Sequence, residues 1–118
     1  AGVVDMVPAD GKPVAEVCAT MQAMLTEAAA LAPVLLISVP PIANPDVTAR
    51  IAELNRAYAE LCAEHGFGWA DVFETLKGSS AYMESLRDGI HAGPEGCEVM
   101  AEALFALPSV QAFLTTQP

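Results

Sequence analysis

The order of apolar segments in this chain predicts an α/β fold in which helices cover both faces of a parallel sheet. Hydrophobic patterns with helical spacing alternate with two short apolar runs, in the order helix, strand, helix, strand, helix. This alternation is typical of parallel strands joined by crossover helices. The first apolar run, residues 33–39, has no polar alternation, as expected of a strand buried on both faces. We therefore expect a three-layer α/β/α sandwich.

The first helix is predicted over residues 13–31, after a loop over 1–12 that contains Gly, Pro and Asp. Pro13 suits a first helical turn, where its missing N–H would be unpaired in any case. Apolar residues then recur at spacings of three and four: Val14, Val17, Met21, Met24, Ala28 and Leu31. The helix must end before Pro33, because a residue that precedes proline is pushed out of the helical region.

The first strand, 33–39, is ended by Pro40 and Pro41. The second helix is predicted over 45–65, because Asn44 followed by proline is typical of a capped helix start. His65 followed by Gly66 is typical of a helix end, where glycine adopts the left-handed conformation.

The second strand is predicted over residues 67–73, and short helical turns over 74–87. A loop over 88–93 precedes a helix that opens at Pro94. Four residues are expected on its inner face, namely Cys97, Met100, Leu104 and Leu107. A final short turn begins at Pro108 and carries Val110 and Phe113.

Two strands are too few for a stable sheet, which usually has four to six. The strand at 33–39 needs neighbours on both edges. Residues 1–118 are therefore expected to be the C-terminal part of a single domain. Either an N-terminal segment or a second copy of the chain would complete the sheet.

The net charge of the chain is -10, with 15 acidic and 5 basic residues. Nucleic acid is excluded as a partner, because phosphate binding needs clustered Lys and Arg. An anionic membrane surface is disfavoured for the same reason, and no apolar run reaches the ~18 residues of a membrane span. No leader sequence opens the chain, but it starts at Ala1. The compartment is left open, with the cytoplasm favoured.

The 3 cysteines, Cys18, Cys62 and Cys97, fall in helical apolar patterns and are interpreted as small buried hydrophobic residues. They form neither a disulfide framework nor a CxxC metal motif. The 2 histidines are far apart, so no metal site is predicted. No cofactor is predicted either, because the chain has no glycine-rich phosphate loop.

Asp88 and His91 are the candidate catalytic residues, in the loop sequence DGIHAG. A short turn can bring an Asp carboxylate onto the Nδ1–H of an imidazole three residues later, which leaves Nε2 free as a base. A surface histidine in a capped loop is the competing interpretation. Among the serines, Ser38 lies in a flat strand and is a poor nucleophile candidate. The others are interpreted as helix caps (Ser79, Ser80 and Ser109) and as a surface residue (Ser85).

The stretch DGIHAGPEGCEVMAEAL, residues 88–104, resembles the last signature block of the SGNH/GDSL serine esterases and lipases. The segment VLLISVPPI, residues 34–42, is similar to that family's penultimate strand and its Pro-rich loop. The resemblance implies the C-terminal half of a flavodoxin-like, three-layer hydrolase domain. It also implies hydrolysis of carboxylic ester or thioester bonds in a small acyl-ester substrate, with His91 as general base and Asp88 as its orienting partner.

Two departures from the family pattern bear on activity. The nucleophilic serine of the family's Gly-Asp-Ser block is absent, so a segment outside this chain would have to supply it. Val4 stands where the family has an oxyanion Asn, or else the true block lies before Ala1. A lost oxyanion donor costs on the order of 2.7–4 kcal/mol of transition-state stabilisation. The alternative function is therefore a non-catalytic, truncated or degenerate hydrolase-like domain that acts in binding or self-assembly.

Overall fold

The computed structural model describes residues 12–116, with side chains through Thr115. Helices and strands alternate as the sequence predicts. The elements in chain order are α2 (Val14–Ala29), β1 (Leu35–Ile37), α3 (Pro45–His65), β2 (Gly68–Ala70), α4 (Phe73–Lys77), α5 (Ser80–Glu84), α6 (Pro94–Ala106) and α7 (Pro108–Thr116).

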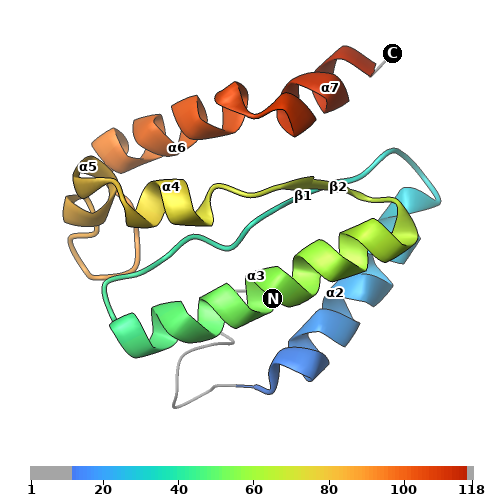
Figure 1. Cartoon of the computed structure of the whole chain (residues 1–118), viewed down its shortest axis with the longest axis horizontal. Helices are drawn as coiled ribbons and strands as arrows, with labels where there is room; N and C mark the ends of the chain where they lie inside the picture. Colours follow the sequence, from blue (N-terminus) through green and yellow to red (C-terminus); the bar gives the residue numbers. More distant parts are fainter. Residues whose placement is uncertain (1–11, 117–118) are drawn as a thin grey trace.

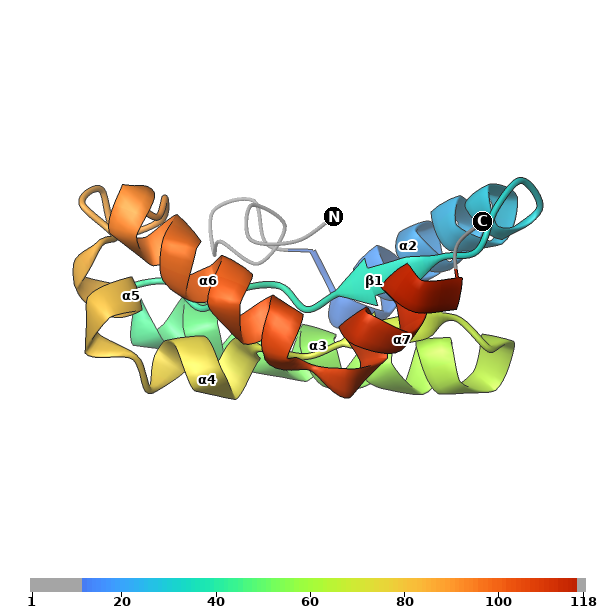
Figure 2. The ribbon, with the colours of Figure 1, turned by 90° about the horizontal axis from the view of Figure 1, so that it is seen from above.

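The helices lie on both sides of the two strands. The long helix α3, with α2 against it, lies on one side of β1 and β2, and α6 and α7 lie on the other (Figure 1). Seen from above, α6 and α7 cross over the other layers and leave much of β1 in view (Figure 2). The described part of the chain is thus a mixed fold, mainly helical, around a small sheet.

The strands β1 and β2 are parallel, as predicted, and pair Leu35 with Gly68, Leu36 with Trp69 and Ile37 with Ala70. The ladder continues at both ends, where Gly68 N–H donates to Val34 C=O at 2.9 Å and Ser38 N–H to Ala70 C=O at 2.9 Å. Gly68 suits this close approach, because a Cβ there would lie 2.9 Å from the Leu35 side chain.

The other edge of β1 carries backbone groups that point away from β2. Since successive residues of a strand direct their N–H and C=O to opposite edges, those of Leu35 and Ile37 face away from the ladder. The backbone groups of Val39 have the same orientation, but there the Asn55 side chain of α3 makes the hydrogen bonds that a neighbouring strand would otherwise make. It accepts from Val39 N–H at 2.8 Å and donates to Val39 C=O at 2.9 Å. The strand edge is therefore closed at Val39 by a side chain.

Two hydrophobic clusters hold the layers together. The first lies around α3, where Ile51, Leu54 and Tyr58 are fully buried. The second lies under α6 and is centred on Val72, Leu76, Tyr82 and Leu86. Both helix termini of α3 form as the sequence predicts: Asn44 Oδ1 accepts from the N–H groups of Asp46 and Val47, and Gly66 ends the helix at φ 73°. Local capping and burial thus fix α3 firmly.

Several details differ from the sequence predictions. The strands are shorter than predicted, and Phe73 begins α4 instead of ending β2. Ile37 is 41% exposed, so β1 is not buried on both faces in this chain. Cys97 is exposed, whereas Ser85 is buried, and its hydroxyl donates to Tyr82 C=O at 2.6 Å. Of the serines interpreted as helix caps, Ser79 is confirmed, because its side chain accepts from Tyr82 N–H. Ser80 and Ser109 instead lie in the first turns of α5 and α7.

Among the described residues, no single helix is long and apolar enough to cross a membrane. The helices α6 and α7 reach that length and composition only as a pair, across a bend of 74°.

Candidate active site

The segment from Ser85 to Gly93 is a closed loop that presents Asp88 and His91. Its two ends are joined by the bond from Gly93 N–H to Ser85 C=O at 3.0 Å and by an antiparallel bridge between Leu86 and Ala92. At its tip, Gly89 has φ 84°, a conformation that glycine adopts without strain. Gly89 N–H donates to Leu86 C=O at 3.0 Å. The loop shape therefore follows from local bonds and one glycine.

Asp88 uses both carboxylate oxygens within this loop. Oδ1 accepts from the backbone N–H of Ile90 at 2.9 Å and of His91 at 2.7 Å. Oδ2 lies 2.6 Å from His91 Nδ1. The contact expected from the three-residue spacing is therefore present. The two backbone bonds fix the orientation of the carboxylate that His91 Nδ1 contacts.

These hydrogen-bond donors stabilise the ionised form of the Asp88 carboxyl group. The backbone N–H of His91, then the His91 side chain and the N–H of Ile90, hold the pKa of Asp88 well below its usual range. An ionised carboxylate can only accept, so Nδ1 of His91 is the donor in this contact, and in the neutral imidazole Nε2 then carries the lone pair. The His91 side chain is 81% exposed and that of Asp88 57%. The dyad can thus offer a basic nitrogen at the surface.

The other polar residues considered as catalytic are occupied elsewhere. Ser38 is 2% exposed, and its Oγ accepts from Val72 N–H at 3.0 Å, so it ties β1 to the start of α4. His65 ends α3, where its Nε2 lies 3.3 Å from Gln22 Nε2 and its ring stacks on Phe67. Both side chains have structural roles.

Val4, the residue at the place of the oxyanion Asn, lies outside the described residues. Between residues 12 and 116, no group of three or more His, Cys, Asp and Glu side chains is arranged to hold a metal ion.

A small apolar pocket adjoins Asp88, beside the loop after β1. Its volume is about 300 Å³ and its lining is Ile42, Ala43, Asn44, Val47, Asp88, Gly89 and Ile90. The loop after β1 and the loop at 85–93 meet here, where Ala43 N–H donates to Gly89 C=O at 2.9 Å. The only sequence signal was the apolar residue inside each loop, Ile42 and Ile90.

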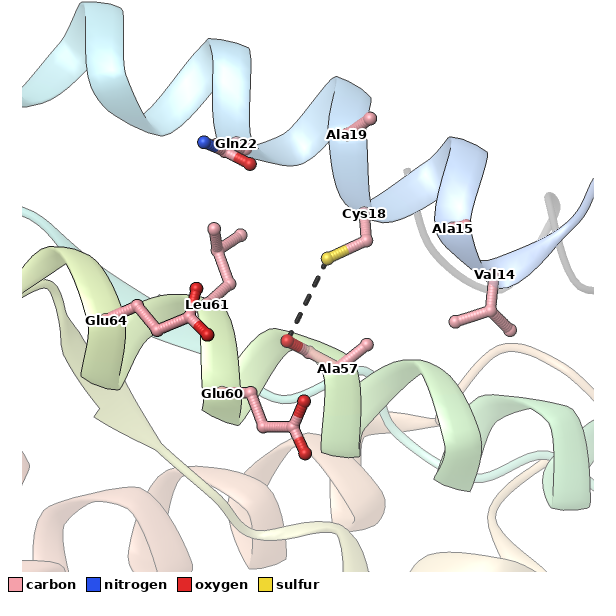
Figure 3. A pocket seen from close by; sticks show the side chains of 9 residues that line it. All are labelled: Val14, Ala15, Cys18, Ala19, Gln22, Ala57, Glu60, Leu61 and Glu64. Carbon is pink, nitrogen blue, oxygen red and sulfur yellow. Dashed lines mark hydrogen bonds between the residues drawn. The ribbon is translucent and has the colours of Figure 1, made fainter.

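A second hollow, of about 400 Å³, lies between α2 and α3 (Figure 3). There the Cys18 thiol donates to Ala57 C=O at 3.8 Å, and Glu60 and Glu64 extend from α3 (Figure 3). Burial, together with the charges of the two glutamates, raises the pKa of Cys18. The thiol is therefore a poor nucleophile. We interpret this hollow as a gap in the packing between α2 and α3.

Comparison with protein-family models and with curated proteins found no match to this chain. Solved structures do resemble it, among them the following two. A proposed acylhydrolase from Bacteroides fragilis matches with a TM-score of 0.68 and 24% identity over 90% of this chain and 54% of its own length. A mutant of an acetyl-xylooligosaccharide esterase from Geobacillus matches with a TM-score of 0.69 and 17% identity over 92% of this chain and 56% of its own.

This chain thus spans about half the length of the structures it matches. At identities of 24% and 17% the similarity concerns the fold alone. Helices on both sides of a parallel sheet, together with these two similarities, show that the chain shares the fold of about half of each of these two structures.

Proposed function

We propose that this chain carries the general base and its orienting carboxylate in a hydrolase of carboxylic esters or thioesters, and that a segment outside it supplies the nucleophilic serine. The observation that carries the proposal is the dyad, in which Asp88 Oδ2 lies 2.6 Å from His91 Nδ1 on a closed loop.

In this mechanism, His91 Nε2 takes the proton of the serine hydroxyl as the oxygen attacks the ester carbonyl. Asp88 holds the proton on Nδ1 and stabilises the imidazolium that forms. His91 then donates its proton to the leaving alcohol or thiol, and an acyl-enzyme remains. A water molecule, activated by the same nitrogen, releases the acid and restores the serine.

The fold and the two structural similarities support this proposal. A doubly covered parallel sheet carries its sites at the carboxyl ends of its strands, and the loop after β1 is bonded to the dyad loop there. The resemblance of residues 88–104 to the last SGNH/GDSL block gives the same roles to Asp88 and His91. We propose further that residues 1–118 form the C-terminal half of such a domain.

The test uses the full-length protein that contains this chain, with p-nitrophenyl acetate as substrate. His91→Ala should abolish hydrolysis, and Asp88→Asn should lower kcat by about 10⁴, as loss of the carboxylate does in a serine protease. The matched control is His65→Ala, because His65 is also exposed and belongs to a helix end. Equal activity of the His91 variant and the wild type would remove the dyad from the mechanism.

A fluorophosphonate label locates the serine. It should attach to one serine that precedes residue 1, in a reaction that depends on His91. The second candidate function, a non-catalytic binding or assembly domain, is favoured by Val4. It predicts no labelling and no hydrolysis in a protein that folds.

A further inference from the structure

The pocket beside Asp88 has a buried apolar floor and a half-exposed apolar wall. Ile42 and Val47 form the floor and are 4% and 2% exposed. Ile90 forms a wall and is 40% exposed. The polar atoms at the border belong to Asn44 and Asp88. A ligand here therefore meets hydrocarbon on most sides.

Hydrogen bonds fix the backbone around the pocket. The Thr48 hydroxyl accepts from Ile42 N–H at 3.1 Å and donates to Ile42 C=O at 2.8 Å, which fixes the loop after β1 against α3. The bond between Ala43 N–H and Gly89 C=O then fixes the dyad loop against it. A preformed pocket of this kind costs little ordering energy when a ligand enters.

The position of the pocket links it to the dyad. Asp88 borders the pocket and also holds His91 through Oδ2. Ile90 lies between them in sequence, and its N–H donates to Asp88 Oδ1. The pocket therefore adjoins the residue that orients the proposed general base.

The lining selects the chemistry of that chain. A site for sugar hydroxyls needs several polar partners, whereas hydrocarbon needs none. The Asp88 carboxylate and the chain's net charge of -10 disfavour a ligand that carries an anionic group. A volume of about 300 Å³ is at the lower end for ligand pockets, which suits a medium-length chain better than a long one.

We propose that this pocket binds the hydrocarbon chain of the acyl group of a neutral ester, and that Ile90 sets the chain length accepted. The inference rests on the proposed function, because it places the acyl group of that same reaction. It predicts a preference for medium-chain acyl esters over acetyl esters.

Binding is measured without hydrolysis. The full-length protein is labelled at the methyl groups of Ile and Val and titrated with methyl hexyl ketone, a neutral ketone, and with acetone as control. The methyl resonances of Ile42, Val47 and Ile90 should shift with the long ketone and not with acetone. Those of Ile37, which is 41% exposed and outside the pocket, should not.

Kinetics then test the role of Ile90. The ratio of kcat/KM for p-nitrophenyl hexanoate to that for the acetate should fall about tenfold in Ile90→Ala, since lost methylene contacts change specificity by this order. In Ile90→Trp, which fills the pocket, it should fall on the order of a hundredfold. The ratio in Ile37→Ala, the same substitution at an isoleucine outside the pocket, should equal that of the wild type. Circular dichroism checks that each variant folds.

The outcomes separate this inference from the proposed function. Hydrolysis with no localised methyl shifts, or with an unchanged chain-length ratio in both Ile90 variants, overturns the pocket and leaves the dyad intact. Localised shifts with the long ketone in a protein that hydrolyses neither ester support a hydrocarbon site and overturn the esterase. In a third outcome, the methyl groups of Ile42 and Val47 respond to neither ketone and Ile90→Trp unfolds the protein. Another part of the protein then fills the pocket, and the inference is overturned.

Discussion

Asp88 receives three hydrogen bonds within a loop of a few residues, two from backbone N–H groups and one from an imidazole. An exposed ion pair contributes little to stability, because water and salt screen it. Orientation is the more important effect here. The backbone donors hold the carboxylate at one angle, so the imidazole is held in one tautomer and one direction even at the surface.

The first prediction concerns the titration of Asp88. Its pKa is lowered by the N–H donors of the loop, so the carboxylate should stay ionised near pH 3.9, where an unperturbed Asp is about half protonated. Because the folded pKa is below the unfolded one, whatever Asp88 contributes to loop order is present above the unfolded pKa. It is lost only as the pH falls through the folded pKa. Carbon NMR of the side-chain carboxyl measures the midpoint, and a midpoint at or above 3.9 would contradict the prediction.

Much of this loop could be predicted from single residues, and some could not. The spacing of Asp88 and His91 predicts their contact, because the geometry is local. Ser85 was predicted at the surface, yet it is buried beneath Gly96, since the residue that packs on it belongs to the next helix. Exposure is decided by such distant neighbours, which a serine in a polar segment does not reveal.

At the scale of elements, the start of α6 is packed directly onto the dyad loop. A Cβ at Gly96 would overlap the Ser85 hydroxyl and lie 2.9 Å from Ser85 Cβ and 3.0 Å from Ala92 Cβ. Only glycine lets the helix approach the loop this closely. The position of His91 therefore depends on the absence of one methyl group.

Gly96→Ala should accordingly destabilise the protein by about 1–3 kcal/mol, the usual cost of overpacking. Gly78→Ala is the control, because a Cβ there makes only ordinary contacts and Gly78 has a helical φ of -82°. That change should be neutral or stabilising, by up to about 1 kcal/mol. Urea unfolding measures both. Equal stability of the two variants would mean that α6 can shift away from the loop.

The side-chain bridge from Asn55 to Val39 gives another prediction. Asn55→Ala leaves two buried backbone groups without a partner, so we expect a loss of about 2–4 kcal/mol in the free energy of unfolding. Asn44→Ala, which removes only the cap of the same helix, should cost about 1 kcal/mol. Thermal or urea unfolding of the two variants provides the comparison. A smaller loss for Asn55→Ala than for Asn44→Ala would show that water replaces the bridge.

The helices were predicted better than the strands, for a physical reason. Asn44, Pro45 and Gly66 determine the ends of α3 through contacts within a few residues. A strand ends where its partner ends, and β1 pairs over three residues only. The pocket at Ile42 and Ile90 depends on two loops that meet in space, which no local pattern in the sequence encodes.

At the scale of the whole molecule, one edge of β1 meets no other strand among the described residues. The backbone groups of Leu35 and Ile37 face away from β2, and Ile37 is 41% exposed. An open apolar strand edge is a template for another strand. In a longer protein, a strand of the same domain would cover it.

The isolated 118-residue chain should therefore self-associate through this edge. Light scattering should give a mass above the 12.3 kDa of one chain, and Ile37→Lys should lower it, because an inward charge on an edge strand blocks pairing. Leu31→Lys, a change at an 88% exposed site outside β1, is the control. A monodisperse wild-type monomer would contradict the sheet assignment.

The bond from Ala43 N–H to Gly89 C=O has one more consequence. Ala43 is exposed, so its amide proton would exchange with solvent quickly if that bond were absent. Its exchange rate therefore reports each opening of the loop that carries His91. A ligand that brings the two loops closer together should slow deuterium uptake at the Ala43 amide more than at amides without such a bond. Hydrogen exchange at Ala43 would then measure how much of the site is occupied.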